Sequence, residues 1–198
     1  LYPEKGDKIT EIAGVEIIDI QITKNIFHTY VNPEREVGLK AKQLTGLELN
    51  FLKNKPKFKE IANKFIDFIK GCDKIIIHNA DYDINFINTE LKNINFPIND
   101  IEKKFNIIDT LKFARTIYPG KKNSIDALCE RYKIKHNRKL HGALIDAELL
   151  AIIFLNLTTG QNIIELTEKY ERKNDNLKKK PTLIKIKQEE TDLHNKYI

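Results

Sequence analysis

The sequence contains no methionine and no tryptophan, and only two cysteines among its 198 residues. Cys72 and Cys129 lie far apart and show none of the close spacings that zinc-binding cysteines have. We therefore expect neither a disulfide framework nor a cysteine metal site. We interpret both residues as buried small hydrophobic side chains of a protein in the reducing cytoplasm.

Long hydrophobic runs are also missing. No stretch approaches the ~20 apolar residues that a membrane-spanning helix needs, and 41% hydrophobic with 31% charged residues is ordinary for a globular domain. The formal net charge of +6 is a weak indication of a nucleic-acid partner. Isoleucine, lysine and asparagine are abundant throughout, as in proteins from AT-rich genomes, so the charge alone does not indicate a function.

Hydrophobic patterns predict an α/β domain with a mixed sheet over residues 1–160. β-branched residues at 9–20 predict a strand, and residues 25–31 its hairpin partner, joined through Thr23-Lys24-Asn25. Residues 34–46 are expected to be irregular, with a short helix at 47–52. The remaining pattern predicts helices at 57–70, 83–93, 110–117, 123–132 and 142–157, and buried strands at 74–78 and 105–108. This order is typical of a sheet with helices on its faces.

The composition changes after residue 160. Residues 161–182 are highly charged and are interpreted as a linker. Residues 183–198 begin with an alternating pattern but carry too little apolar surface to fold alone. We expect this tail to become ordered on a partner.

Acidic residues follow both predicted buried strands, and a histidine and an aspartate stand at the start of the last helix. Asp83 lies in the segment after the first of these strands, and Asp109 directly follows the second. His141 precedes the last helix, and Asp146 follows it by five positions. Each acid by itself could be a helix cap or a charge that favours a helix N-terminus. Together they can meet at one sheet edge, where α/β proteins bind ligands.

Such a cluster has a definite chemistry. Clustered carboxylates repel one another unless cations compensate, and oxygen ligands without cysteine favour Mg²⁺ or Mn²⁺. Two such ions about 4 Å apart can hold the attacking and leaving oxygens of a phosphodiester. A nearby histidine can take the proton of the attacking water. The pattern therefore predicts two-metal phosphodiester hydrolysis.

Three segments of the sequence resemble the DEDDh 3′–5′ exonucleases, and in particular the proofreading epsilon subunits of bacterial DNA polymerase III. The segments are His78-Asn79-Ala80-Asp81-Tyr82-Asp83, Pro119-Gly120-Lys121-Lys122-Asn123-Ser124-Ile125-Asp126-Ala127-Leu128-Cys129 and Leu140-His141-Gly142-Ala143-Leu144-Ile145-Asp146-Ala147. The resemblance extends over residues 8–161 with its spacing kept. It implies a ribonuclease H-like fold, two divalent cations, and removal of mismatched nucleotides from single-stranded DNA 3′ ends.

The resemblance also implies roles for the residues that match the family's motifs. His141 takes the place of the general base, and Asp83 and Asp146 take the places of metal-binding acids, with Asp146 also next to the substrate. Asp109 matches an acid in a supporting role. His78 and Asn79, which lie in the same motif as Asp83, are expected to have supporting roles, as Asp109 does.

Two further positions concern the substrate. Thr45 falls on the loop that packs against the terminal nucleotide, where some relatives carry histidine. Lys40 stands where relatives often carry a substrate-contacting glutamate, and this departure makes the contact doubtful.

One motif of the family is not found. Its first motif, an Asp-x-Glu on the first strand, is expected just before Leu1, because Leu1-Tyr2-Pro3 resembles the residues that follow that motif. The first residue is not methionine, which agrees with a piece of a longer product. A chain beginning at Leu1 is expected to lack half of the metal ligands and the strand that carries them, and hence to be inactive.

Two partner segments are expected beyond the nuclease domain. Gln161, Ile164 and Leu166 resemble peptides that bind the bacterial sliding clamp. Residues 183–198 resemble the epsilon tail that docks on the polymerase catalytic subunit. Two alternatives stay open at this point: a free-standing DEDDh exonuclease acting on RNA or DNA ends, and a non-catalytic scaffold subunit if the missing motif is genuine.

Overall fold

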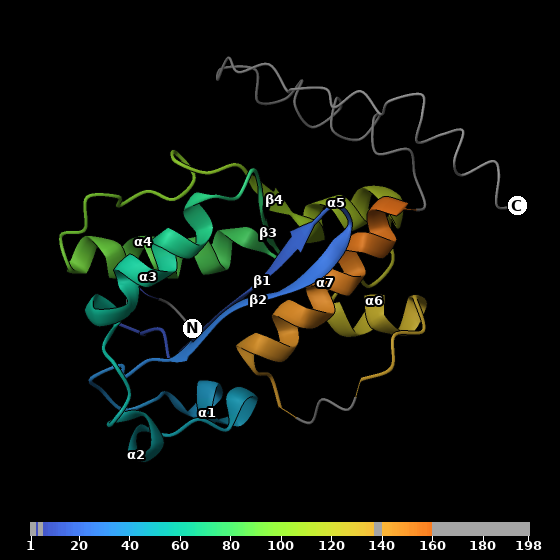
Figure 1. The fold of residues 1–198 in the computed structure, drawn as a ribbon. Helices are drawn as coiled ribbons and strands as arrows, with labels where there is room; N and C mark the ends of the chain where they lie inside the picture. Colours follow the sequence, from blue (N-terminus) through green and yellow to red (C-terminus); the bar gives the residue numbers. More distant parts are fainter. Residues whose placement is uncertain (1–2, 4–5, 137–139, 160–198) are drawn as a thin grey trace, which may run out of the picture. The chain divides into compact units, whose positions relative to one another are not determined.

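Four strands and seven helices make up the part of the chain that the computed structural model describes, which is residues 3, 6–136 and 140–159 (Figure 1). None of these helices combines the length and the apolar character that crossing a membrane would need. The elements are, in order, β1 (Glu11–Ile18), β2 (Gln21–Tyr30), α1 (Leu39–Thr45), α2 (Leu49–Leu52), α3 (Phe58–Lys70), β3 (Ile75–Ile77), α4 (Ala80–Asn93), β4 (Ile107–Asp109), α5 (Thr110–Ile117), α6 (Ile125–Arg131) and α7 (Ala143–Thr159).

β1 and β2 form an antiparallel hairpin, but its turn is not where the sequence predicts it. The turn residues are Asp19 and Ile20, with φ angles of 49° and 64°. Two successive residues with positive φ match the right-handed twist of a tight hairpin. Thr23 and Asn25 instead lie within β2, and both donate side-chain hydrogen bonds to Glu16 on β1. The predicted Thr23-Lys24-Asn25 turn is therefore wrong.

β3 and β4 form a second, parallel pair, in which Ile75 to Ile77 align with Ile107 to Asp109. The sheet structure is thus mixed, as predicted, but among the described residues it consists of two separate pairs. β1 pairs only with β2 in this part of the chain, and β3 only with β4. The predicted additional first strand stays a prediction.

Helices cover both faces of the hairpin, because side chains alternate between the faces of a strand. On one face Phe27 packs against Phe65 and Phe68 of α3, with ring centroids 5.7 Å apart in both pairs. Gly14 allows this approach, since a Cβ there would lie 2.7 Å from the Phe68 ring. α7 packs against β1 and β2 and also contacts α6. Figure 1 shows α3 and α4 on one side of the hairpin and α7 on the other.

Three local predictions need correction. Residues 39–45 form α1 instead of irregular chain, and this helix ends at Gly46, which adopts a left-handed φ of 70°. α4 begins at Ala80, so Asp83 lies inside its first turn and does not open the helix. Cys72 is exposed just after the end of α3, whereas Cys129 is buried as predicted.

Candidate active site

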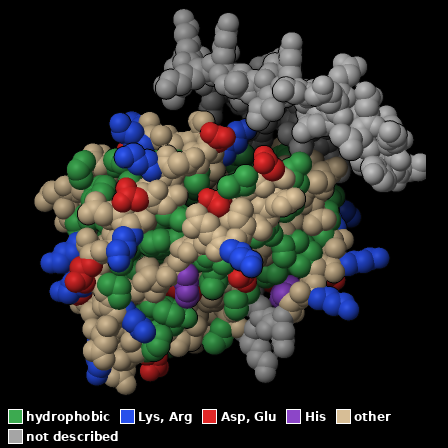
Figure 2. Space-filling view, viewed as in Figure 1, with side chains coloured by type: hydrophobic (Ala, Val, Ile, Leu, Met, Phe, Trp, Pro, Cys, Tyr) green, Lys and Arg blue, Asp and Glu red, His purple; other side chains and the backbone are tan. Residues whose placement is uncertain are grey.

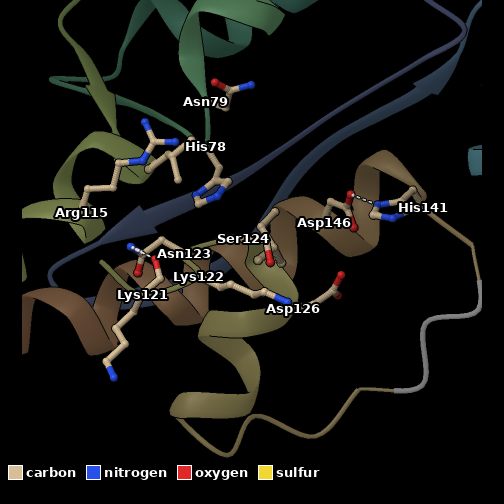
Figure 3. A pocket seen from close by; sticks show the side chains of 12 residues that line it. His78, Asn79, Arg115, Lys121, Lys122, Asn123, Ser124, Asp126, His141 and Asp146 are labelled. Atoms are coloured by element: carbon tan, nitrogen blue, oxygen red, sulfur yellow. Dashed lines mark hydrogen bonds and ion pairs between the residues drawn. The ribbon is translucent and has the colours of Figure 1, made fainter. Parts of the chain in front are cut away.

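His141 and Asp146 meet at the start of α7, as the sequence predicts. The helix begins at Ala143, so His141 precedes it and Asp146 lies in its first turn. Asp146 donates its N–H to the Gly142 carbonyl at 2.9 Å, which closes that turn. The two side chains are in contact, with Nδ1 of His141 3.3 Å from Oδ2 of Asp146. A histidine on the loop and an acid one turn later therefore face the same space (Figure 3).

The loop before α7 is held against the end of α1. The N–H of His141 donates to the Leu44 carbonyl at 2.9 Å. The Leu140 side chain covers Gly46, where a Cβ would lie only 2.7 Å from Leu140 Cδ1. Thr45 lies between these two contacts, and its hydroxyl is hydrogen-bonded to Ala41 and Leu47. The structure therefore brings the Thr45 loop next to the His141 loop.

A pocket of about 820 Å³ opens beside His141 and Asp146. Figure 3 shows His78 and Asn79, from the end of β3, and Arg115 of α5 at the same pocket. The full lining is His78, Asn79, Leu111, Arg115, Lys121, Lys122, Asn123, Ser124, Ile125, Asp126, His141 and Asp146. All three segments that carry the family resemblance thus contribute to one concave site.

Asp83 is electrostatically linked to this site. Although much of the residue is accessible to solvent, protein atoms crowd its carboxylate, and this desolvation raises the pKa of Asp83 to about 6. Repulsion from the carboxylates of Asp109 and Asp146 makes a smaller contribution to this rise in pKa. The three acids that the sequence predicts to converge are therefore close enough to influence one another.

Asp109 is buried, and its side chain caps the starts of two helices, α4 and α5. Its carboxylate accepts the N–H groups of Asn79 and Ala80 before and at the start of α4. It also accepts those of Leu111 and Lys112 at the start of α5, at 2.9 and 3.2 Å. The interpretation of Asp109 as a helix cap is thus confirmed. The alternative reading of Asp83 as a cap is wrong, because the N-cap position of α4 is Asn79.

His78 is positioned by Thr110, the first residue of α5. Nδ1 of His78 lies 2.9 Å from the Thr110 hydroxyl, which in turn donates to the Ile77 carbonyl. Burial lowers the pKa of His78, and the charge of Arg115 acts in the same direction. His78 therefore favours its neutral form at the inner side of the pocket.

Several features of the site are not evident from the sequence patterns. Arg115 brings a cationic side chain to the pocket from outside the resembling segments, whereas Lys121 and Lys122 belong to the second of these segments, in which no role was predicted for them. Lys40 is exposed on α1 and does not line the pocket. Among the described residues, no group of three or more His, Cys, Asp or Glu side chains forms a metal site.

Glu11 on β1 is a further site neighbour that the sequence patterns miss. Its Oε2 accepts the N–H of Ala143, the first residue of α7, at 2.9 Å. Its Oε1 lies 2.8 Å from Nε2 of His28. The two partners are 132 and 17 positions away, so no short-range motif marks the residue.

Charges of both signs are interspersed on the face that Figure 2 shows. Lys and Arg side chains alternate there with Asp and Glu, and no large area of one sign is visible on this face.

The strand–helix arrangement and the pocket beside His141 and Asp146 agree with a nuclease of the DEDDh type, and comparisons with known proteins show the family. The family model described as exonuclease, RNase_T, matches residues 1–154. DNA polymerase III subunit epsilon of Buchnera aphidicola subsp. Schizaphis graminum is 43% identical, over 99% of this chain and 88% of that protein. The subunit from Rickettsia conorii is 39% identical, over 100% and 90%. The chain belongs to this exonuclease family, among the DNA polymerase III epsilon subunits.

Solved structures support the fold. Exonuclease X in complex with 5′ overhanging duplex DNA is 25% identical, with a TM-score of 0.61 over 77% of this chain and 84% of that chain. The nuclease domain of 3′hExo, a DEDDh family member bound to rAMP, is 15% identical, with a TM-score of 0.59 over 77% and 93%. The predicted ribonuclease H-like class is therefore confirmed.

Proposed function

We propose that this protein is the 3′–5′ proofreading exonuclease subunit of a replicative DNA polymerase and acts in the cytoplasm on single-stranded DNA 3′ ends. The observation that carries the proposal is the contact of His141 with Asp146 over a pocket shared with His78 and Asn79. Identity to epsilon subunits over nearly the whole chain supports the polymerase association. The DNA-bound structure of exonuclease X supports DNA as the substrate.

The reaction is hydrolysis of the 3′-terminal phosphodiester. His141 accepts a proton from the attacking water, the new P–O bond forms, and the bond to the 3′ oxygen of the preceding nucleotide breaks. The leaving 3′ oxygen takes up a proton from solvent, and the products are a nucleoside 5′-monophosphate and a shortened strand with a 3′ hydroxyl. Asp146 holds the imidazole through Nδ1 and stabilises the imidazolium that forms.

Asp83 and Asp146 have the chemistry of ligands for hard divalent cations, Mg²⁺ or Mn²⁺. Desolvation, together with repulsion from the carboxylates of Asp109 and Asp146, raises the pKa of Asp83 to about 6. When bound, two such ions would stabilise the attacking and leaving oxygens. Asp109 fits a supporting role, because backbone N–H groups already occupy its carboxylate.

Arg115, Lys121 and Lys122 supply the positive charge that a phosphodiester backbone needs. Thr45 is proposed to lie against the terminal nucleotide, because its loop packs on the His141 loop. Lys40 is not assigned a contact, since it lies outside the pocket.

Two partner contacts belong to the same proposal. Gln161, Ile164 and Leu166 would bind the sliding clamp, and residues 183–198 would bind the polymerase catalytic subunit. Both segments lie outside the described residues. They are supported by their resemblance to the corresponding peptides of the family.

The test is His141→Ala in the full-length gene product. The assay follows release of the last nucleotide from a 3′-labelled single-stranded DNA with a mismatched end, in Mg²⁺. Loss of a general base is expected to lower kcat at least ~10²-fold, while co-purification with the polymerase catalytic subunit is kept. His136→Ala is the matched control, because His136 does not line the pocket.

Unchanged activity in His141→Ala would remove His141 from this role. An RNA substrate of the same sequence, cleaved faster than the DNA, would favour the free-standing exonuclease. A full-length protein that binds the polymerase but cleaves neither substrate would favour the scaffold alternative.

A further inference from the structure

The buried carboxylate of Glu11 joins three parts of the chain that are distant in sequence. Its side chain is only 8% exposed. One oxygen accepts the Ala143 N–H on α7, and the other contacts the His28 ring on β2. The carboxylate is thus oriented by protein groups on both sides and does not line the pocket.

The bond to Ala143 is favourable for two physical reasons. The first N–H groups of a helix have no partner within the helix, and Glu11 supplies one for the first residue of α7. The carboxylate also places negative charge at the positive end of the helix dipole. β1 therefore caps a helix that begins 132 positions later in the chain.

This cap acts at the point where the chain passes from His141 into α7. Ala143 stands two residues after His141 and three before Asp146. The backbone of His141 is held separately by the Leu44 carbonyl. The two hydrogen bonds lie on either side of Gly142, and together they set the direction in which His141 and Asp146 approach each other.

We propose that Glu11 is a positioning residue of the nuclease site: it fastens the first residue of α7 to β1 and so keeps His141 in register with Asp146. The inference rests on the proposed function. His28 completes the arrangement by holding the second oxygen of the carboxylate. Glu11 acts through the backbone and touches none of the reacting groups.

The experiment compares Glu11→Ala and Glu11→Gln in the full-length protein, with the single-stranded DNA assay. Glutamine keeps an acceptor oxygen for Ala143, whereas alanine removes it. Displacement of a catalytic group by about 1 Å can cost ~10²-fold. We therefore expect Glu11→Ala to lower kcat by about 10- to 100-fold with KM unchanged, and Glu11→Gln to remain close to wild type.

Glu16→Ala is the matched control. Glu16 is on the same strand, and its carboxylate likewise accepts two hydrogen bonds, but both come from side chains of β2, Thr23 and Asn25, and not from α7. It is expected to leave kcat unchanged. A loss in Glu16→Ala equal to that in Glu11→Ala would mean that any damage to β1 has this effect, and would overturn the inference.

Combination with His141→Ala shows whether Glu11 acts through the histidine. Because the base is then absent, Glu11→Ala is expected to add no further loss. Losses that multiply would overturn the proposal. Ala143→Pro is a second route to the same bond, since proline lacks the N–H but is well tolerated at the first position of a helix. It is expected to reproduce the kcat loss even if Glu11→Ala does not fold.

Amide hydrogen exchange of Ala143 gives a readout that does not depend on activity. Glu11→Ala is expected to speed this exchange, and Glu11→Gln to leave it slow. Unchanged exchange in Glu11→Ala would overturn the positioning role. If the wild-type protein had no nuclease activity, the proposed function would fail, while the exchange result would still decide whether Glu11 fixes α7.

Discussion

At the scale of single residues, the surroundings of Asp83 are unfavourable for an ionised carboxylate. Desolvation and the neighbouring carboxylates of Asp109 and Asp146 raise its pKa to about 6, so the charged form is disfavoured in the folded protein. Strong perturbation of this kind is concentrated at functional sites, where chemistry requires a group that folding alone would not select. Asp83 is therefore expected to lower stability at neutral pH.

The resulting prediction is that Asp83→Asn stabilises the cation-free protein in a pH-dependent way. Well below the unfolded-state pKa near 4, Asp83 is protonated in both the folded and the unfolded protein. It then causes no difference in stability between the wild type and Asp83→Asn. As the pH rises toward 6, the unfolded state ionises first, so the wild type loses stability relative to a neutral asparagine. Thermal unfolding in EDTA should show a higher Tm for Asp83→Asn at pH 8 and a much smaller difference at pH 4.

Asp81→Asn is the control for this measurement. Asp81 is in the same helical turn, but its carboxylate pairs with Lys112 at 3.0 Å. Its replacement is expected to bring no gain at pH 8. A gain from Asp83→Asn that is the same at both pH values would contradict the electrostatic explanation.

At the scale of elements, Asp109 ties the β3–β4 pair to two helices. One carboxylate accepts four backbone N–H groups, from Asn79, Ala80, Leu111 and Lys112. It thereby sets where α4 and α5 begin relative to the strand ends. Since Asn79 and His78 line the pocket, this cap also shapes the inner wall of the site.

We expect Asp109→Ala to destabilise the fold by about 3 kcal/mol, because buried N–H groups at two helix starts lose a charged acceptor. Ser124→Ala is the comparison, since Ser124 caps α6 through a single bond to the Ala127 N–H. It should cost about 1 kcal/mol. Urea unfolding measures both. Equal costs would mean that the four bonds of Asp109 contribute no more than one ordinary cap.

The elements also show how far sequence patterns reach. α3 was predictable because its buried residues recur at helical spacing. β3 and β4 were predictable because each contains consecutive isoleucines, although most of these residues are only partly buried and not fully buried as the sequence suggested. α1 was not, since Gly38 at its start forms no side-chain cap bond and only Ala41 among its residues is buried. The hairpin turn was misplaced because Asp19 and Ile20 adopt positive φ without glycine or asparagine.

At the scale of the whole molecule, the candidate site depends on contacts between distant segments. The residues at the start of α7 were predictable, because His141 and Asp146 carry their chemistry in a local motif. Glu11 was not, because its partner Ala143 is 132 positions away. Sequence reading thus finds the reactive groups but misses the groups that hold them in place.

The proposed polymerase association leads to a prediction for the complete protein. Deletion of residues 183–198 is expected to abolish co-purification with the polymerase catalytic subunit, because these residues would supply the docking peptide. The exonuclease rate on free single-stranded DNA should not change, since every residue assigned to the reaction precedes residue 160. Retained co-purification would place the docking surface elsewhere.

The bond between Glu11 and Ala143 also orders events during synthesis. A ribosome adds roughly 5–20 residues per second, so Ala143 is made on the order of 10 s after Glu11. Until then β1 has no α7 to cap, although the strands and α3 can already associate. The start of α7 therefore joins β1 only after the hairpin and α3 have been made. A chain that stops before His141 lacks both the general base and the hydrogen bond that positions it.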